Sequence, residues 1–159
     1  PTEGESRHMR GLIVATGAVL ALGMAGTAFA QGDVIAERRA GFRQISQHME
    51  AVAAVVQGRG DQAQIVARVD QMLPFYQSLP NRFPAASLTP PIAQGTGEGQ
   101  TRALAAIEAN RTGFQQADAN MITALNAMKA AAQAGGVTAD TLRATGGACA
   151  TCHQSFRAR

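Results

Sequence analysis

The end of the chain carries two thiols and an imidazole in a C-x-x-C-H string, Cys149-Ala150-Thr151-Cys152-His153. Two thiols at this spacing can add across the vinyl groups of a haem, and the imidazole that follows can then ligate the iron. In a helix, with about 100° between consecutive residues, these three side chains share a face about 100° wide. One flat macrocycle can then be held by two thioether bonds and one axial ligand. We therefore expect one covalently bound haem c at this motif.

Other chemistries are open to the same residues. Both cysteines of the chain lie inside the motif, so a disulfide between them would close a very short loop. A thioredoxin-like dithiol normally begins a helix that follows a strand, and the sequence shows no such βαβ pattern. Zinc prefers four ligands, and beyond the first 30 residues the sequence offers one further histidine, His48. Zinc binding and dithiol redox chemistry are the alternatives to haem.

The amino-terminal region has the pattern of a secretory signal peptide. Met9-Arg10 begins a short positive segment, residues 12–24 are apolar, and Ala28-Phe29-Ala30 is an A-x-A cleavage site. The apolar run is short for a membrane span, which needs about 20 residues; a buried amino-terminal helix is the alternative. We expect a signal peptide over residues 9–30, with residues 1–8 a cloning scar or a misplaced start.

Export would give the motif a suitable setting. Thiols that are to be joined to haem are handled in an oxidising compartment outside the cytosol, so we expect the periplasm. We expect no contact with the membrane after signal cleavage. The net charge is +3, without a basic run or interleaved aromatic residues, so nucleic acid is not an expected partner.

Residues 31–159 have the length of one domain, and their alanine-rich, tryptophan-free composition favours closely packed helices. Four helical segments are predicted. The first follows an N-cap at Asp33 and ends near Gln57. The second begins at Asp61 with Gln64 placed for a capping box, and Pro74 should end or kink it.

The third predicted helix covers about 101–132, and the fourth begins near Thr138 and carries the haem motif. Between the second and third helices, residues 80–100 contain four prolines and three glycines, which indicates a long irregular crossing. Arg111 and Asp118 interrupt the apolar stripe of the third helix and are expected to pair with each other or with a polar group in the core. Gly113 lies inside the same predicted helix, where glycine is less stable than alanine, so we expect a tertiary contact that requires it.

Apolar residues in these segments are spaced three and four apart, which favours helices that pack nearly parallel. The predicted fold is all-α: a four-helix antiparallel bundle with one long connection between the second and third helices. The haem would lie near the carboxyl-terminal helix.

Several segments resemble one known family. Residues 146–157 read G-G-A-C-A-T-C-H-Q-S-F-R, and residues 37–42 read E-R-R-A-G-F. Together with Phe83-Pro84, the glycine-rich crossing and T-R-A-L at 101–104, they resemble the cytochrome c′ family and its methionine-ligated low-spin relatives. These proteins carry C-x-x-C-H on the last helix of a four-helix bundle.

The resemblance implies a role for each matching residue. Cys149 and Cys152 would form the thioethers and His153 the proximal iron ligand. Basic residues would accompany the haem. Arg38 would face a propionate, Arg39 stands where the family commonly has glutamine, and Arg157 would lie beside the proximal face.

Phe42 stands where this family places either a distal steric plug or a ligating methionine. A phenyl ring has no lone pair for iron, so the resemblance implies a five-coordinate, high-spin haem. The distal pocket would be lined by Phe42, Ile45 and Met49. Met49, Met72 and Met121 are the candidates for a sixth ligand, although methionine at core spacing is more often packing. His48 points away from this stripe.

Three functions follow as expectations. The chain could be an electron carrier, or it could bind small diatomic gases at the open iron position, with NO and CO as ligands; the resemblance supports NO. A low-spin His/Met-ligated carrier is the alternative. No distal histidine or carboxylate lies on the Phe42 stripe, so we do not expect a peroxidase or another enzyme. Family relatives often pair through their first two helices, which makes a homodimer a further expectation, and the redox partner protein is not indicated.

Overall fold

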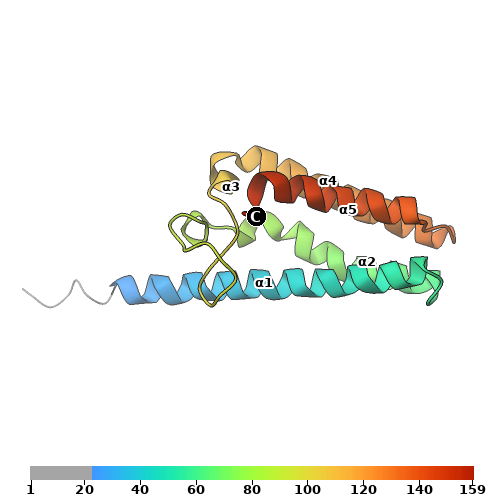
Figure 1. The fold of residues 1–159 in the computed structure, drawn as a ribbon, viewed down its shortest axis with the longest axis horizontal. Coiled ribbons are helices and arrows are strands. Elements are labelled where there is room, and N and C mark those ends of the chain that lie inside the picture. Colours follow the sequence, from blue (N-terminus) through green and yellow to red (C-terminus); the bar gives the residue numbers. More distant parts are fainter. Residues whose placement is uncertain (1–22) are drawn as a thin grey trace, which may run out of the picture.

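The structure is a computed structural model that describes residues 23–159, so residues 1–8 and most of the expected signal peptide lie outside the described residues. Four long helices make up the bundle (Figure 1): α1 (Gly23–Val56), α2 (Gln62–Gln77), α4 (Arg111–Gln133) and α5 (Ala139–Phe156). Shorter turns lie between α2 and α4: η1 (Leu79–Arg82), η2 (Ala85–Ser87) and α3 (Ala106–Ala109). Within residues 23–159 there are isolated β-bridges but no strand, and the predicted all-α bundle is confirmed.

The helices pack in sequence order, with α1 on α2, α2 on α4 and α4 on α5. In Figure 1, α4 and α5 form one side of the molecule, and α1 runs along the other and extends past its neighbours at the amino-terminal end. The shared core consists of aliphatic and methionine side chains such as Val52, Ile65, Val69, Met72, Leu125 and Met128. None of the helices in the described part of the chain is long and apolar enough to cross a membrane.

The amino ends of α1 and α2 differ from the predictions in detail. α1 passes through Asp33, so the prediction of an N-cap there is wrong. Residues 23–32 precede Asp33 in the helix and contain three alanines, the residue with the highest helix propensity, as well as three glycines. Asp61 does cap α2, but its side chain accepts from Ala63 N at 2.9 Å rather than joining Gln64 in a capping box. Pro74 lies in the last turn, and α2 continues to Gln77.

The predicted start of the third helix is also wrong. Residues 101–105 run in extended and turn conformations, with bridges from Thr101 and Leu104 to the crossing. Asn110 then interrupts the helix and caps α4 by accepting from Gly113 N at 3.0 Å. A Cβ on Gly113 would lie 2.4 Å from Asn110 Nδ2, so the cap requires the glycine.

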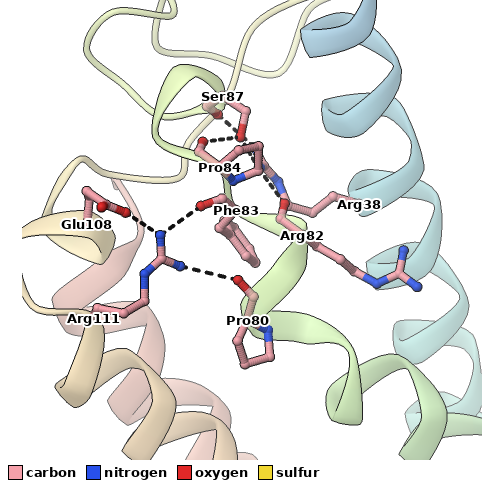
Figure 2. Close-up of polar contacts among 8 residues, drawn as sticks. All are labelled: Arg38, Pro80, Arg82, Phe83, Pro84, Ser87, Glu108 and Arg111. Carbon is pink, nitrogen blue, oxygen red and sulfur yellow. Dashed lines mark hydrogen bonds and ion pairs between the residues drawn. The ribbon is translucent and has the colours of Figure 1, made fainter.

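The crossing is held from α4 by Arg111 (Figure 2). Its guanidinium donates to the carbonyls of Pro80 at 3.2 Å and Phe83 at 3.1 Å and forms an ion pair with Glu108. The expected pairing of Arg111 with Asp118 is therefore wrong. Arg111 interrupts the apolar stripe because it binds the crossing and not a charged residue in the core.

The crossing is held from α1 by Arg38, which is 3% exposed. Its Nη1 donates to the Arg82 carbonyl at 3.1 Å and to Ser87 Oγ at 2.9 Å, and its Nη2 donates to the Ser87 carbonyl at 3.1 Å (Figure 2). Nη2 also donates to Thr101 Oγ1 at 2.8 Å. The guanidinium carbon also lies 4.4 Å from the centre of the Phe83 ring. Burial lowers the pKa of Arg38 to about 10, so the group stays charged at neutral pH.

The end of α5 is fastened to the segment that follows the crossing. Leu104 N donates to the Phe156 carbonyl at 3.0 Å, and Ala158 N donates to the Arg102 carbonyl at 2.7 Å. Arg102 Nε returns a bond to the Ala158 carbonyl at 3.0 Å. These contacts fix the chain directly after the C-x-x-C-H motif.

Candidate haem site

The C-x-x-C-H motif occupies the last two turns of α5, as predicted. Cys149 and Cys152 are half-buried free thiols that pack against the core. His153 follows on the same helix with its ring exposed. The three groups therefore lie along one boundary of α5, with sulfur toward the bundle and imidazole toward solvent.

The antiparallel register of α4 and α5 shows what faces the thiols. Phe114 stacks edge-on against Phe156, with ring centres 5.3 Å apart. A second contact joins the helices where Met121 Sδ accepts from Cys149 Sγ at 3.6 Å. Met121 is seven residues after Phe114 on α4, and Cys149 is seven residues before Phe156 on α5. Because the two helices keep this register between the two contacts, Asp118 lies opposite Cys152.

Both thiols are in their neutral form. Burial, and then the negative charges of Asp118 and Cys149, raises the pKa of Cys152 to about 11. Burial likewise raises the pKa of Cys149, against a smaller opposing effect of a hydrogen bond with Tyr76. Reactive redox cysteines have lowered pKa values, so the dithiol alternative loses support.

Asp118 and Tyr76 are two residues of this site that sequence reasoning did not assign to it. Asp118 is 6% exposed, its Oδ1 has no hydrogen-bond partner, and burial raises its pKa to about 6. Tyr76 comes from α2 and is 5% exposed. Burial, followed by the charges of Cys149, Cys152 and Asp118, raises its pKa. The sequence feature that could have indicated both residues is a polar group within an otherwise apolar stripe of a helix.

His153 is suited to bind a metal as a neutral imidazole. Its pKa is lowered by partial desolvation first, and then by the positive charges of Arg157 and Arg102. Arg157 is close enough to affect this imidazole, and its expected place beside the proximal haem face stays a prediction. Neutral imidazole is the form that ligates iron.

The predicted distal residues lie on the face of α1 that packs on the bundle. Ile45 is buried, and Phe42 and Met49 are half-buried against the core. The Phe42 ring meets Phe75 edge-on at 4.9 Å between centres. Gly41 makes this possible, because a Cβ there would lie 2.0 Å from the Phe75 ring.

A chain of aromatic contacts connects Phe42 with the end of α5. Phe83 in the crossing lies 6.5 Å from Phe42 and 5.1 Å from Phe114, between ring centres. Phe114 in turn contacts Phe156, three residues beyond His153. The candidate distal residue and the candidate proximal ligand are thus at the same end of the bundle.

The two arginines expected to face propionates both bind the crossing. Arg38 uses four of its five N–H groups on crossing residues, as described above. Arg39 donates to the Gly97 carbonyl at 2.7 Å and to that of Thr96. Their role toward a propionate stays a prediction.

Met72, another candidate sixth ligand, and His48, the further histidine considered for zinc, form no hydrogen bond with the motif in the described part of the chain. Met72 is fully buried in the core, and His48 on α1 is half-buried, with its Nδ1 3.4 Å from Arg68 Nη1. Burial and the charge of Arg68 lower the pKa of His48. Met121, by contrast, contacts the motif directly.

The donor set fits haem c better than zinc. Two neutral thiols on the core side of one helix can form two thioethers, and the adjacent neutral imidazole can ligate iron. Across residues 23–159, no cluster of three or more His, Cys, Asp or Glu side chains is arranged to hold a metal ion by itself. A structural zinc site would need such a cluster.

A four-helix bundle with C-x-x-C-H at the end of its last helix defines a c-type cytochrome of the carboxyl-terminal-haem class. The sequence model of the family described as cytochrome c′ matches residues 33–157, and the chain belongs to this family. Its members bind one covalent haem c, which is therefore the cofactor of this chain.

Individual relatives agree with this assignment. Cytochrome c′ of Rhodopseudomonas palustris (strain ATCC BAA-98 / CGA009) is 30% identical over 150 residues, covering 93% of this chain and 97% of the relative. Cytochrome c′ of Rubrivivax gelatinosus is 30% identical over 128 residues, or 79% and 95% of the two chains.

Solved structures share the fold. Cytochrome c′ of Thermochromatium tepidum superposes with a TM-score of 0.68 at 23% identity, over 81% of this chain and 97% of that one. The Rubrivivax gelatinosus structure gives a TM-score of 0.63 at 26% identity, over 80% and 96%.

Proposed function

We propose that this protein is a periplasmic cytochrome whose haem is joined by thioethers to Cys149 and Cys152 and ligated by His153. The observation that carries the proposal is the arrangement of these groups on α5. Two neutral thiols face the bundle, and an exposed imidazole with a lowered pKa follows them. When bound, the haem supplies one-electron chemistry and an iron that can take a further ligand.

Phe42 determines what can reach the other side of the iron in this proposal. Its ring is fixed between Phe75 and Phe83 and offers no lone pair. With Ile45 and Met49 it forms an apolar wall, which favours small neutral diatomics over anions and bulky ligands. The iron is then five-coordinate and binds NO or CO, in addition to or instead of carrying electrons.

The second candidate is a low-spin electron carrier with a methionine as sixth ligand. Met121 contacts the motif, and Met49 is half-buried on the Phe42 face. Either side chain would need to turn its sulfur from its present packing toward the iron. Phe42, which cannot ligate, favours the five-coordinate form.

An enzymatic role is not part of the proposal. Peroxidase chemistry needs a distal acid or base, and the residues of the α1 stripe that we place at the distal side are Phe42, Ile45 and Met49. Asp118, a buried carboxyl, lies on the thiol side of the site.

Export and assembly complete the proposal. Residues 9–30 would be removed as a signal peptide, and residues 31–159 would form the mature haem domain. One solved relative, 20% identical, is described as a cytochrome c′ with ligand-controlled dimer dissociation. We propose a homodimer through α1 and α2, to be tested by light scattering with and without CO.

The visible spectrum of the reduced protein tests the five-coordinate haem. The protein is expressed with haem-attachment machinery, purified and reduced. A broad high-spin ferrous band is expected, whereas a sharp low-spin α-band would show a sixth protein ligand. NO and CO affinities, measured together with the midpoint potential, decide between gas binding and electron transfer.

A further inference from the structure

Asp118 is a buried carboxyl for which the proposed haem site provides no role. It is 6% exposed, and its Oδ1 accepts no hydrogen bond. None of the ion pairs within residues 23–159 includes it. The ionised form of a carboxyl in such a place is destabilised, because it has lost its hydration and gained neither a hydrogen-bond donor nor a counter-charge.

The register of α4 and α5 places this carboxyl beside the motif. Asp118 follows Phe114 by one turn and precedes Met121 by one turn. Those two neighbours contact Phe156 and Cys149. Asp118 therefore faces α5 at the level of Cys152, next to the expected iron ligand but not on it.

No positive charge compensates the carboxyl. The titratable groups close to it are Tyr76 from α2 and Cys152 from α5, both neutral at pH 7. The cation nearest along α4, Arg111, is engaged by Glu108 and the crossing. α1 contributes no charged partner to it, since its buried cation, Arg38, binds the crossing, as does the more exposed Arg39.

We propose that Asp118 is a redox-linked proton site, which binds a proton when the haem iron is reduced and releases it when the iron is oxidised. This inference rests on the proposed attachment of haem at Cys149 and Cys152. A soluble one-electron donor supplies the electron that converts ferric to ferrous iron. Solvent supplies the proton, and the new O–H bond forms on the Asp118 carboxylate, so each electron taken up is matched by one proton.

The physical reason is charge balance in a buried site. Ferric haem carries one more positive charge than ferrous haem, and a carboxylate near it stabilises that charge more strongly in a low dielectric than in water. Reduction removes this compensation and leaves the carboxylate unpaired, which favours its protonation. By linkage, protonation must then favour reduction to the same extent.

The midpoint potential as a function of pH tests this coupling in the haem-loaded full protein. With one proton per electron, the potential falls by up to about 59 mV per pH unit, since a tenfold change corresponds to that value for a one-electron couple. We expect this slope between about pH 5 and 8 in the natural protein. Asp118→Asn should flatten it and raise the potential at pH 8.

Asp140→Asn is the matched control, because Asp140 is an exposed carboxylate on α5 paired with Arg143. It should leave the slope unchanged. Haem propionates also titrate, but both variants retain them. An Asp118→Asn protein with the slope of the natural protein would overturn the inference.

An infrared difference spectrum gives a second readout that does not need the variant to fold. Reduction of the natural protein should produce the C=O band of a protonated carboxyl, and its absence would also overturn the inference. Failure of the haem site itself is recognised separately, because the purified protein would then lack covalent haem and its absorption.

Discussion

Cys149 Sγ and Met121 Sδ lie 3.6 Å apart, which brings α4 into direct contact with the first thiol of the C-x-x-C-H motif. Met121 is 3% exposed and belongs to the stripe that α4 packs against α5. Its sulfur therefore supports the attachment side of the site. We therefore propose that Met121 packs beside the thiol that haem would modify and does not serve as a sixth iron ligand.

Replacing this sulfur tests the assignment. Met121→Leu preserves volume and apolar character, so it should cost less than about 1.5 kcal/mol of unfolding free energy. The spin state of ferric and ferrous iron should stay that of the natural protein, as read from the visible spectrum. Conversion from a low-spin to a high-spin spectrum in this variant would identify Met121 as a ligand instead.

Phe42→Met tests the distal assignment. Thioether sulfur can ligate iron where phenyl cannot, so the variant should shift toward a six-coordinate, low-spin haem with a sharp ferrous α-band and weaker CO binding. Phe42→Leu is the control and should remain high-spin. An unchanged spin state in Phe42→Met would remove Phe42 from the distal site.

Arg38→Met tests the role of the buried guanidinium in holding the crossing. The variant loses four hydrogen bonds to Arg82, Ser87 and Thr101. Hydrogen bonds from charged groups contribute about 1.5–3 kcal/mol each and are not additive, so roughly 3 kcal/mol of stability should be lost in denaturant unfolding. Arg39→Met, which removes exposed contacts, should cost much less; equal losses would contradict the anchoring role of Arg38.

The raised pKa of Asp118 leads to a prediction of how the free energy of unfolding depends on pH. Its folded pKa of about 6 is above the unfolded value near 3.9, so the folded state binds the proton more tightly. Its contribution is fully present below about pH 4 and is lost as pH rises through 6, which lowers stability by roughly 3 kcal/mol.

Asp118→Asn should therefore be more stable than the natural protein at pH 8, and the difference should vanish near pH 4. Denaturant unfolding at the two pH values measures it. The exposed control Asp140→Asn should show no such crossover, and a difference independent of pH would argue against a buried, protonated Asp118.

The sequence was sufficient for the parts of the molecule that depend on local pattern. Asp61 caps the start of α2 and α5 begins after Thr138, as predicted, and the motif is helical because its neighbours form an amphipathic α5. The apolar stripes also predicted the bundle, because their spacing is a local pattern within each helix.

Long-range polar contacts could not be predicted. Arg38 reaches residues 44 to 63 positions away, and nothing local to α1 indicates those partners. Arg111 interrupts its stripe because it binds the carbonyls of Pro80 and Phe83, and a side-chain-to-backbone bond between residues this far apart has no local sequence signature. The start of α4 depends on the cap that Asn110 forms with Gly113 N. This cap needs the space left by a glycine, which the helical pattern does not indicate.

The most direct test of the account is the mass and colour of the denatured protein. The mature chain is produced in a host that attaches haem, unfolded in acid and extracted to remove any non-covalent haem. We predict that the polypeptide keeps its Soret absorption and exceeds its bare mass by one haem, and that Cys149→Ser with Cys152→Ser abolishes both. A colourless polypeptide of bare mass would contradict the proposed haem attachment.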